Sequence, residues 1–514
     1  MQIVLPILIL CLLLGCKTPS TAENETPMDT GTVELSLPLE TPAPTPETVE
    51  VGGQVFDLRE TAVTLSLGSL AEAEDAVSQF PDLLSVTLLA PALTPDEYRA
   101  FTADFPDLAI DCGIQLGGQT VSVHADALDL SAADLPDWTD VLSLFPSLRV
   151  LTLGEASPSE VRDVLAADPG LSVSFLFHGQ PVNAEITELD FNGTAVPTAA
   201  ELDALYALAP QLASIRIDDP DESAQKELAA FDPRAKGVTL HCNLTLLDRT
   251  VAADAETVDF GDRILTDEEA YAVEAALPLF TNLREIDLYE SRLSQETMDT
   301  LFDAHPDLFF GWTFGIWDDF FIVRSDATAF SSGTGQPGFH RWLLTEDDFK
   351  NLRFCKGLQA LDLGHNAIKN LEFLRNWPHM KVLILADTCV TDLSVLAELT
   401  ELEYLELFLT TPDSYEPLTH LPNLLDLNLC HTKKEGKQYR DNDEILLLTQ
   451  IKSLERLWIS KTLTAEQAQL LRDGLPGVEF DFSSPGSTDN GWRTHPRYFI
   501  MRKGFKTHTY IPFE

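Results

Sequence analysis

Basic residues are scarce in this chain of 514 residues, which carries 34 Lys and Arg against 82 Asp and Glu, for a formal net charge of −48 at pH 7. A surface this acidic repels the phosphates of nucleic acids and the headgroups of anionic lipids, so we expect no nucleic-acid partner. The same charge helps to keep a protein soluble, and we interpret it mainly in that way.

Cysteines are also few: seven in the whole chain, too few for a disulfide scaffold. Two of them lie within the first sixteen residues. The other five occupy or adjoin repeat positions where apolar residues occur, and they are Cys112, Cys242, Cys355, Cys389 and Cys430. We predict small, buried or half-buried side chains here, without disulfide or metal roles.

Motifs typical of enzymes are missing as well. The chain contains no G-x-S-x-G, no H-E-x-x-H and no paired C-x-x-C, and its eleven histidines lack metal-ligand spacing. Residues 333–338 match G-x-G-x-x-G, but Pro337 stands where a phosphate-binding helix should begin. Acidic clusters at 218–222 and 441–444 could hold Ca²⁺ weakly, yet neither has the pattern of a calcium loop. The sequence therefore predicts no enzyme, no cofactor and no metal site.

The chain begins with a short apolar run, MQIVLPILILCLLLGC, which no Lys or Arg precedes. The run is too short to span a membrane comfortably and suits the apolar core of a signal peptide. An apolar run followed by a small residue and a cysteine resembles the lipobox of bacterial lipoproteins. This resemblance implies that residues 1–15 are a signal peptide and that Cys16 carries a lipid. The mature protein would then be secreted and lipid-anchored to the outer face of a bacterial membrane. An uncleaved anchor is the alternative.

Residues 16–50 are rich in Pro, Thr and Glu and poor in aromatic residues. Such a composition cannot bury enough apolar surface to fold. We predict that this segment is a disordered tether between the membrane and the folded part of the chain.

Nine copies of the pattern apolar-x-x-apolar-x-apolar follow the tether. Four successive copies end at Leu363, Leu385, Leu407 and Leu429, one every 22 residues. A fixed period of this length is the signature of a solenoid, in which each coil packs on its neighbours. The pattern resembles the leucine-rich repeats of bacterial surface proteins, in particular the internalin-like class. That resemblance implies a short strand, a turn and a loose or 3₁₀ return in each coil of residues 333–482.

Residues 51–332 carry the same motif in longer units of about 65–75 residues. Each unit has two further strand-like pieces, and Ser or Thr residues such as Thr94, Ser157 and Ser294 precede helix-like segments that stop near a proline. We predict the order strand, helix, strand, helix, strand. The fold class is therefore an α/β solenoid, a leucine-rich repeat superhelix in which irregular long units stack on the regular coils.

Three residues after the last leucine of each regular motif stands Asn or Thr. These residues are Asn366, Thr388, Thr410, Thr432 and Thr462. Their side chains can bond backbone groups of the turn, and we expect them to form a structural ladder between coils.

The residues between the motif leucines should line the concave face, because alternate side chains of a strand point to opposite sides. On the regular coils this face combines aromatic with charged residues, as protein-recognition surfaces do. The predicted ligand-binding residues are Tyr404, Glu406, Phe408, Asp426, Asn428, Arg456 and Trp458. Cover by the C-terminal segment and an ordinary solvated surface are the alternatives.

Residues 483–514 differ from the rest of the chain. From Gly491 they contain five Lys and Arg and one acidic residue, with many aromatics. A solenoid must close its last coil, so we predict that this segment is a cap, and a partner-binding extension is the alternative. The whole chain is thus predicted to be a membrane-anchored extracellular binding protein that recognises a protein or a glycan. A structural cell-envelope spacer or scaffold without a discrete ligand is the other possibility.

Overall fold

The computed structural model describes residues 47–513, except 133–140, 334–342, 434–439 and 462. The predicted signal peptide, the lipidation at Cys16 and nearly all of the predicted tether lie outside these residues. No helix in the described part is long and apolar enough to cross a membrane. The chain forms two compact units, residues 1–112 and 113–514, and the boundary between them falls within one strand.

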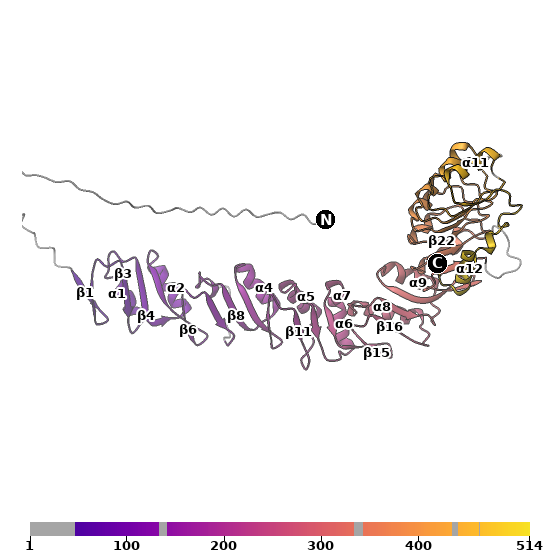
Figure 1. Ribbon diagram of the computed structural model, residues 1–514. Helices are drawn as coiled ribbons and strands as arrows, with labels where there is room; N and C mark the ends of the chain where they lie inside the picture. Colours follow the sequence, from indigo (N-terminus) through magenta and orange to yellow (C-terminus); the bar gives the residue numbers. More distant parts are fainter. Residues whose placement is uncertain (1–46, 133–140, 334–342, 434–439, 462, 514) are drawn as a thin grey trace, which may run out of the picture. The chain divides into compact units, whose positions relative to one another are not determined.

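The first unit holds one hairpin and the first long repeat (Figure 1). Its strands and helices are β1 (Thr48–Val51), β2 (Gln54–Asp57), β3 (Ala62–Ser66), α1 (Leu70–Val77), β4 (Ser85–Leu93), α2 (Pro95–Asp104) and the start of β5 (Ala109–Leu116). β1 and β2 pair antiparallel, whereas β3 and β4 pair parallel with α1 between them. The buried apolar residues of β3 and β4, such as Leu65 and Leu88, alternate with more exposed ones, so one face of these strands packs against the helices.

The second unit contains three more long repeats. Their elements are β6 (Gln119–Ser122), β7 (Ala127–Leu130), β8 (Val150–Glu155), α4 (Pro158–Ala167), β9 (Ser172–Phe177), β10 (Gln180–Asn183), β11 (Glu188–Asp190), α5 (Ala199–Leu208), β12 (Ser214–Arg216), α6 (Glu222–Phe231), α7 (Pro233–Lys236), β13 (Thr239–His241), β14 (Asn243–Leu246), β15 (Arg249–Ala252), β16 (Thr257–Asp259), α8 (Asp267–Ala276), η1 (Leu277–Leu279), β17 (Glu285–Leu288), α9 (Gln295–Ala304), β18 (Phe309–Ile316) and β19 (Phe321–Arg324). Three parallel strands recur in each repeat. The helices follow the predicted order in the repeats of β11–β13 and β16–β18, whereas the connection from β7 to β8 includes residues outside the described part.

The sequence analysis missed one element of these repeats. After the third strand of each long repeat, the chain reverses direction and forms an antiparallel strand. These strands are β6, β10, β15 and β19. Each long repeat therefore ends in a hairpin, and the strands form separate small sheets instead of one continuous ladder.

Helix starts follow the expected capping chemistry. The hydroxyl groups of Thr94 and Ser157 accept the backbone N–H of the glutamate three residues on, and that glutamate bonds back to the cap backbone. Ser294 caps α9 through the N–H of Thr297. The three helix starts predicted at these residues are confirmed.

The regular coils form a seven-stranded parallel sheet in the order β20 to β26. The strands are β20 (Ala329–Ser331), β21 (Ala360–Asp362), β22 (Val382–Ile384), β23 (Tyr404–Glu406), β24 (Asp426–Asn428), β25 (Arg456–Trp458) and β26 (Glu479–Asp481). The returns between them are η2 (Glu346–Phe354), η3 (Glu372–Asn376), η4 (Ser394–Glu398), η5 (Glu416–His420), α10 (Asn442–Leu448) and α11 (Ala465–Gly474). Leu361, Leu383, Leu405, Leu427 and Leu457 stand in register across five strands and are fully buried. Each of these coils thus has one short parallel strand, and most of the returns are 3₁₀ helices.

The expected ladder of Asn and Thr side chains needs a correction. Thr388 Oγ1 donates to Leu385 O at 2.7 Å and Thr432 Oγ1 to Leu429 O at 2.8 Å, so these bonds close turns within one coil. Two members also reach the preceding coil: Asn366, with 2.9 Å between its Nδ2 and Ser332 Oγ, and Thr432, with 2.6 Å between its Oγ1 and Tyr415 Oη. Thr410 bonds within its own coil, and Thr462 lies outside the described residues.

The five cysteines of the folded region match their prediction. All five are free thiols; Cys112, Cys355 and Cys430 are buried, and the other two are half-buried. Burial raises the pKa of Cys112 to about 11, which makes this thiol unreactive at neutral pH.

Candidate binding groove on the concave face

The structure brings the predicted site residues together on three neighbouring strands. In β23, β24 and β25 the register places Tyr404 beside Asp426 and Asp426 beside Arg456. The next concave row consists of Glu406, Asn428 and Trp458, and Phe408 follows β23 directly. We call the concave side of β20–β26 the groove.

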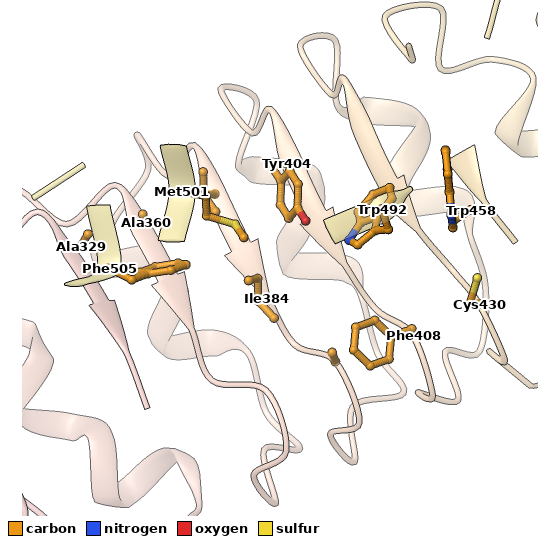
Figure 2. Close-up of a cluster of buried hydrophobic side chains, with 12 residues drawn as sticks. Ala329, Ala360, Ile384, Tyr404, Phe408, Cys430, Trp458, Trp492, Met501 and Phe505 are labelled. Carbon is orange, nitrogen blue, oxygen red and sulfur yellow. The ribbon is translucent and has the colours of Figure 1, made fainter. Parts of the chain in front are cut away.

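This groove is closed, so the expectation of an open ligand-binding face is corrected. Tyr404, Glu406, Phe408, Asp426, Asn428, Arg456 and Trp458 are each at most 4% exposed. The cover is the chain's own C-terminal segment, residues 483–513, which contains η6 (Trp492–Thr494) and α12 (Pro496–Thr507). Figure 2 shows Trp492, Met501 and Phe505 of this segment lying over the strands.

Trp492 packs over β23–β25 in the groove. Its indole Nε1–H donates to Glu406 Oε1 at 2.7 Å. Its ring lies 5.5 Å from the ring of Tyr404 and 5.4 Å from the ring of Trp458, measured between centroids. The guanidinium of Arg456 lies 4.5 Å from the centre of the Trp492 ring. One aromatic side chain thus fills a pocket formed by two strands and satisfies a buried carboxylate.

Ion pairs fix the start of α12. Arg497 Nη1 lies 3.0 Å from Asp426 Oδ1, and the same guanidinium also pairs with Glu455. Asp426 is fully buried and has Arg456 as its second partner, at 3.4 Å. A buried carboxylate between two guanidinium groups is a far more specific feature than an exposed ion pair.

Three buried carboxyl groups in the groove have raised pKa values. Burial raises the pKa of Glu406, although the bonds from Trp492 and Tyr404 act against it. Burial also raises the pKa of Asp362, opposed by the hydroxyl of Ser331, and that of Asp426, opposed by its two arginines.

The far end of the C-terminal segment reaches the first regular coil. Met501 and Phe505 pack in one cluster with Ala329, Ala360 and Ile384 (Figure 2). Beyond α12, the carbonyl of residue 508 accepts the backbone N–H of residues 328 and 329 at 3.0 and 3.2 Å. The segment therefore crosses the sheet from β26 back to β20. The predicted cap is a helical cover of the concave face and does not close the last coil.

Beside the covered part, β18 and β19 border an open hollow of about 880 Å³. Thr313 and Gly315 line it from the side of β18 opposite the buried Trp312 and Phe314. A side chain at Gly315 would collide with Asp319, so the absence of a side chain helps to form this hollow.

The walls of the hollow carry both charges. The guanidinium of Arg324 lies 3.6 Å above the ring of Tyr289, and its Nη2 is held 2.9 Å from Asp326 Oδ2. Arg292 and Glu290 line the same hollow with exposed side chains. Residues 507–509 of the C-terminal segment form the opposite wall.

The hairpin beside the hollow exposes apolar side chains. Phe320 is 43% exposed and Ile322, which also lines the hollow, is 56% exposed. Trp317, Asp318 and Asp319 in the turn have φ angles of 51°, 49° and 60°, left-handed values that non-glycine residues rarely adopt. The sequence did not predict this site: Asp318 and Asp319 are usual turn residues, but no glycine accompanies them and the preceding Trp317 is not a turn residue.

No group of three or more His, Cys, Asp or Glu residues in the described part of the chain is placed to hold a metal ion.

Comparisons with known proteins agree with the repeat pattern but add little detail. No family model and no curated protein matches the chain. Among solved structures, internalin C2 of Listeria monocytogenes is 17% identical over 49% of this chain and 92% of its own, with a TM-score of 0.23. Internalin F of the same species is 13% identical over 84% of this chain and 91% of its own, with a TM-score of 0.25. A leucine-rich repeat protein of Leptospira interrogans is 16% identical over 82% of this chain and all of its own, with a TM-score of 0.27. All three similarities are distant.

Proposed function

We propose that the protein is a non-catalytic binding protein, held at the outer face of a bacterial membrane by a lipid on Cys16, that recognises a protein partner. The apolar run ending in LLGC and the Pro, Thr and Glu-rich segment after it support the anchor and the tether. The repeat solenoid supports a role in recognition, because stacked repeats present a long, rigid surface.

The hollow beside β18 and β19 is the observation on which this proposal depends. The hollow combines the exposed Ile322 with the charged side chains of Arg292, Glu290 and Asp319. Phe320 is exposed on the neighbouring turn and does not line the hollow itself. Apolar anchors surrounded by charged groups are typical of protein-recognition sites.

The backbone geometry of the turn at residues 317–319 also supports a binding role for this region. Other hairpins of the chain place glycine at left-handed positions, as Gly118 and Gly179 do. His178 and Leu247 also have positive φ in two other hairpins, but the turn of residues 317–319 holds three consecutive non-glycine residues there. Of these, Trp317 costs roughly 1–2 kcal/mol, whereas Asp adopts this region more readily. Strain retained at an exposed aromatic turn is consistent with a binding role.

The test is affinity capture from host and bacterial surface extracts with the non-lipidated mature chain. A Phe320→Ser/Ile322→Ser variant should lose at least ten-fold of the captured protein, while its melting temperature stays unchanged. A Val55→Ser/Leu89→Ser variant is the matched control, because these two apolar residues are also exposed, at 68% and 71%. Equal capture by all three forms would rule out the hollow, and no capture by any of them would favour the spacer role. Loss of capture after glycosidase treatment of the extracts would show that the ligand is a glycan.

The anchor has a separate test. A Cys16→Ala variant should appear in the culture medium and should not incorporate radiolabelled palmitate, whereas the wild-type chain should stay with the membrane. A variant that remains membrane-bound would contradict lipidation at this cysteine.

A further inference from the structure

The groove carries a row of buried carboxylates, and each one meets a donor from the C-terminal segment. Glu406 accepts the indole N–H of Trp492, and Asp426 pairs with Arg497 at 3.0 Å. Asp362 on β21 lies 4.0 Å from the guanidinium of Arg502. The groove is therefore complementary in charge and shape to a basic, aromatic helix.

The residues that enter the groove share a simple spacing. Arg497, Met501 and Phe505 follow one another every four residues, so they lie on one side of α12. Trp492 precedes them in the turn before the helix. The outer side of α12 contributes little, since Phe499 is 59% exposed. A helix needs only these few groups to occupy the groove.

We propose that the groove is a binding site for a basic helix with an aromatic anchor on a partner protein. The C-terminal segment is the resident intramolecular ligand of this site, and the partner helix displaces it. This site is separate from the hollow and does not depend on the function proposed for the hollow.

The connectivity of the chain permits this displacement. The segment follows β26, the last strand, so it can leave the sheet without unthreading any coil. The seven strands bond to one another, and their leucines are buried on the opposite side. The connection, residues 483–491, reads SSPGSTDNG and includes the left-handed residues Asn490 and Gly491. Asn428 Nδ2 donates to Ser487 O at 2.8 Å and Trp458 Nε1 to Asp489 O at 3.1 Å, so these bonds break together with the contacts of α12 when the segment leaves. The bonds between the strands of the sheet are not part of this opening.

The first experiment uses the full chain with a protease site inserted between Pro485 and Gly486. After cleavage, a fluorescent peptide of residues 487–513 should bind by anisotropy as the cut segment exchanges. The uncut chain should bind the peptide about 100-fold more weakly or worse, because a tethered ligand competes at an effective concentration of millimolar order. Peptides with Trp492→Ala or Arg497→Glu should bind at least ten-fold more weakly than the parent peptide.

A second peptide tests the chemical class of the partner. It keeps Trp492, Arg497, Met501, Arg502 and Phe505 and replaces the exposed residues of α12 with other helix formers. Binding within about three-fold of the parent peptide supports a groove that recognises only these five residues. Failure of this peptide to bind, or appearance of dimers of the uncut chain that exchange whole segments, would overturn the assignment to a partner helix.

Hydrogen exchange on the unmodified chain gives an independent readout. The backbone amides of α12 should exchange through an opening that leaves the amides of β20–β26 protected. If α12 and the sheet exchange together, only in global unfolding, the segment is a permanent part of the core and the proposal fails. Neither result bears on the capture experiment at the hollow, so the two proposals can fail separately.

Discussion

Trp492 donates its indole N–H to Glu406, a residue 86 positions earlier in the chain, over 2.7 Å. Both side chains are almost fully buried. This single bond ties the C-terminal segment to the middle strand of the regular sheet, and it satisfies a carboxylate that would otherwise be costly to bury.

Replacing Trp492 with Phe keeps an aromatic ring but removes the donor. Glu406 then retains only Tyr404 as a partner, and we expect a loss of about 1–3 kcal/mol in the free energy of unfolding. Denaturant titration measures this loss in the free energy of unfolding. Phe499→Leu on the exposed side of α12 is the control and should change stability by less than about 0.5 kcal/mol. Equal stability of the wild type and the Trp492→Phe variant would show that the bond does not hold the segment.

The buried carboxyl group of Glu406 predicts a dependence of stability on pH. Burial raises its folded-state pKa above the ordinary value of 4.5, so the protonated form is favoured in the folded protein. Its contribution to stability is complete below the unfolded pKa and is lost as the pH rises through the folded pKa. Glu406→Gln cannot ionise, so the variant should gain stability relative to the wild type as the pH increases from 4 to 8.

The measurement is the difference in melting temperature between the variant and the wild type at each pH in this range. This difference separates the effect of Glu406 from the general charge repulsion in a chain of net charge −48. Glu296→Gln, at an exposed position of α9, serves as the control and should show a constant difference. A Glu406→Gln difference that stays flat or falls with increasing pH would contradict the prediction.

Arg456 gives a third prediction, because it is 2% exposed and pairs with the buried Asp426 at 3.4 Å. Arg456→Met leaves Asp426 with one cationic partner, and we expect a loss of about 3–5 kcal/mol. Adding Asp426→Asn should recover part of this loss, since it removes the buried charge. Arg375→Met, at a half-exposed pair with Glu398, should cost at most about 1 kcal/mol. An Arg456→Met variant as stable as Arg375→Met would indicate that water reaches the pair.

The repeat fold could be predicted because its determinants are local. The leucines at 383 and 405 have the spacing of one coil, and they stand beside each other in the sheet. The alternation of side chains in a strand likewise places Tyr404 and Trp458 on the same face as the other concave residues. Both inferences need only a few consecutive residues.

The closure of the groove could not be predicted in the same way. Whether an aromatic face meets water or protein depends on where a distant segment folds, and that is a property of the whole chain. The basic, aromatic composition of residues 491–514 indicated that this segment docks on the repeats. The composition did not indicate where on the repeats the segment docks, because Trp492 and Phe505 could equally close the last coil.

The hairpins show a different limit of the sequence analysis. Gly117 and Gly118 at one hairpin were a usable turn signal, since glycine readily adopts positive φ. The turn beside the hollow has no glycine, and Trp317, Asp318 and Asp319 occupy its left-handed positions, so its signal is weaker. Prediction from sequence is least accurate for residues whose backbone conformation departs from the usual preference of their type. Such residues are common at functional sites.

This turn gives the last prediction. Asp319 has a φ angle of 60°, which glycine adopts without strain, so Asp319→Gly should stabilise the protein by up to about 1 kcal/mol. The same change removes a carboxylate from the wall of the hollow and loosens the turn that presents Phe320. We therefore expect higher stability together with weaker capture of the partner. Asp168→Gly at the exposed end of α4, where φ is −138°, is the control and should not raise stability. An Asp319→Gly variant that is more stable and captures the partner as well as the wild type would show that the strain at this turn has no part in recognition.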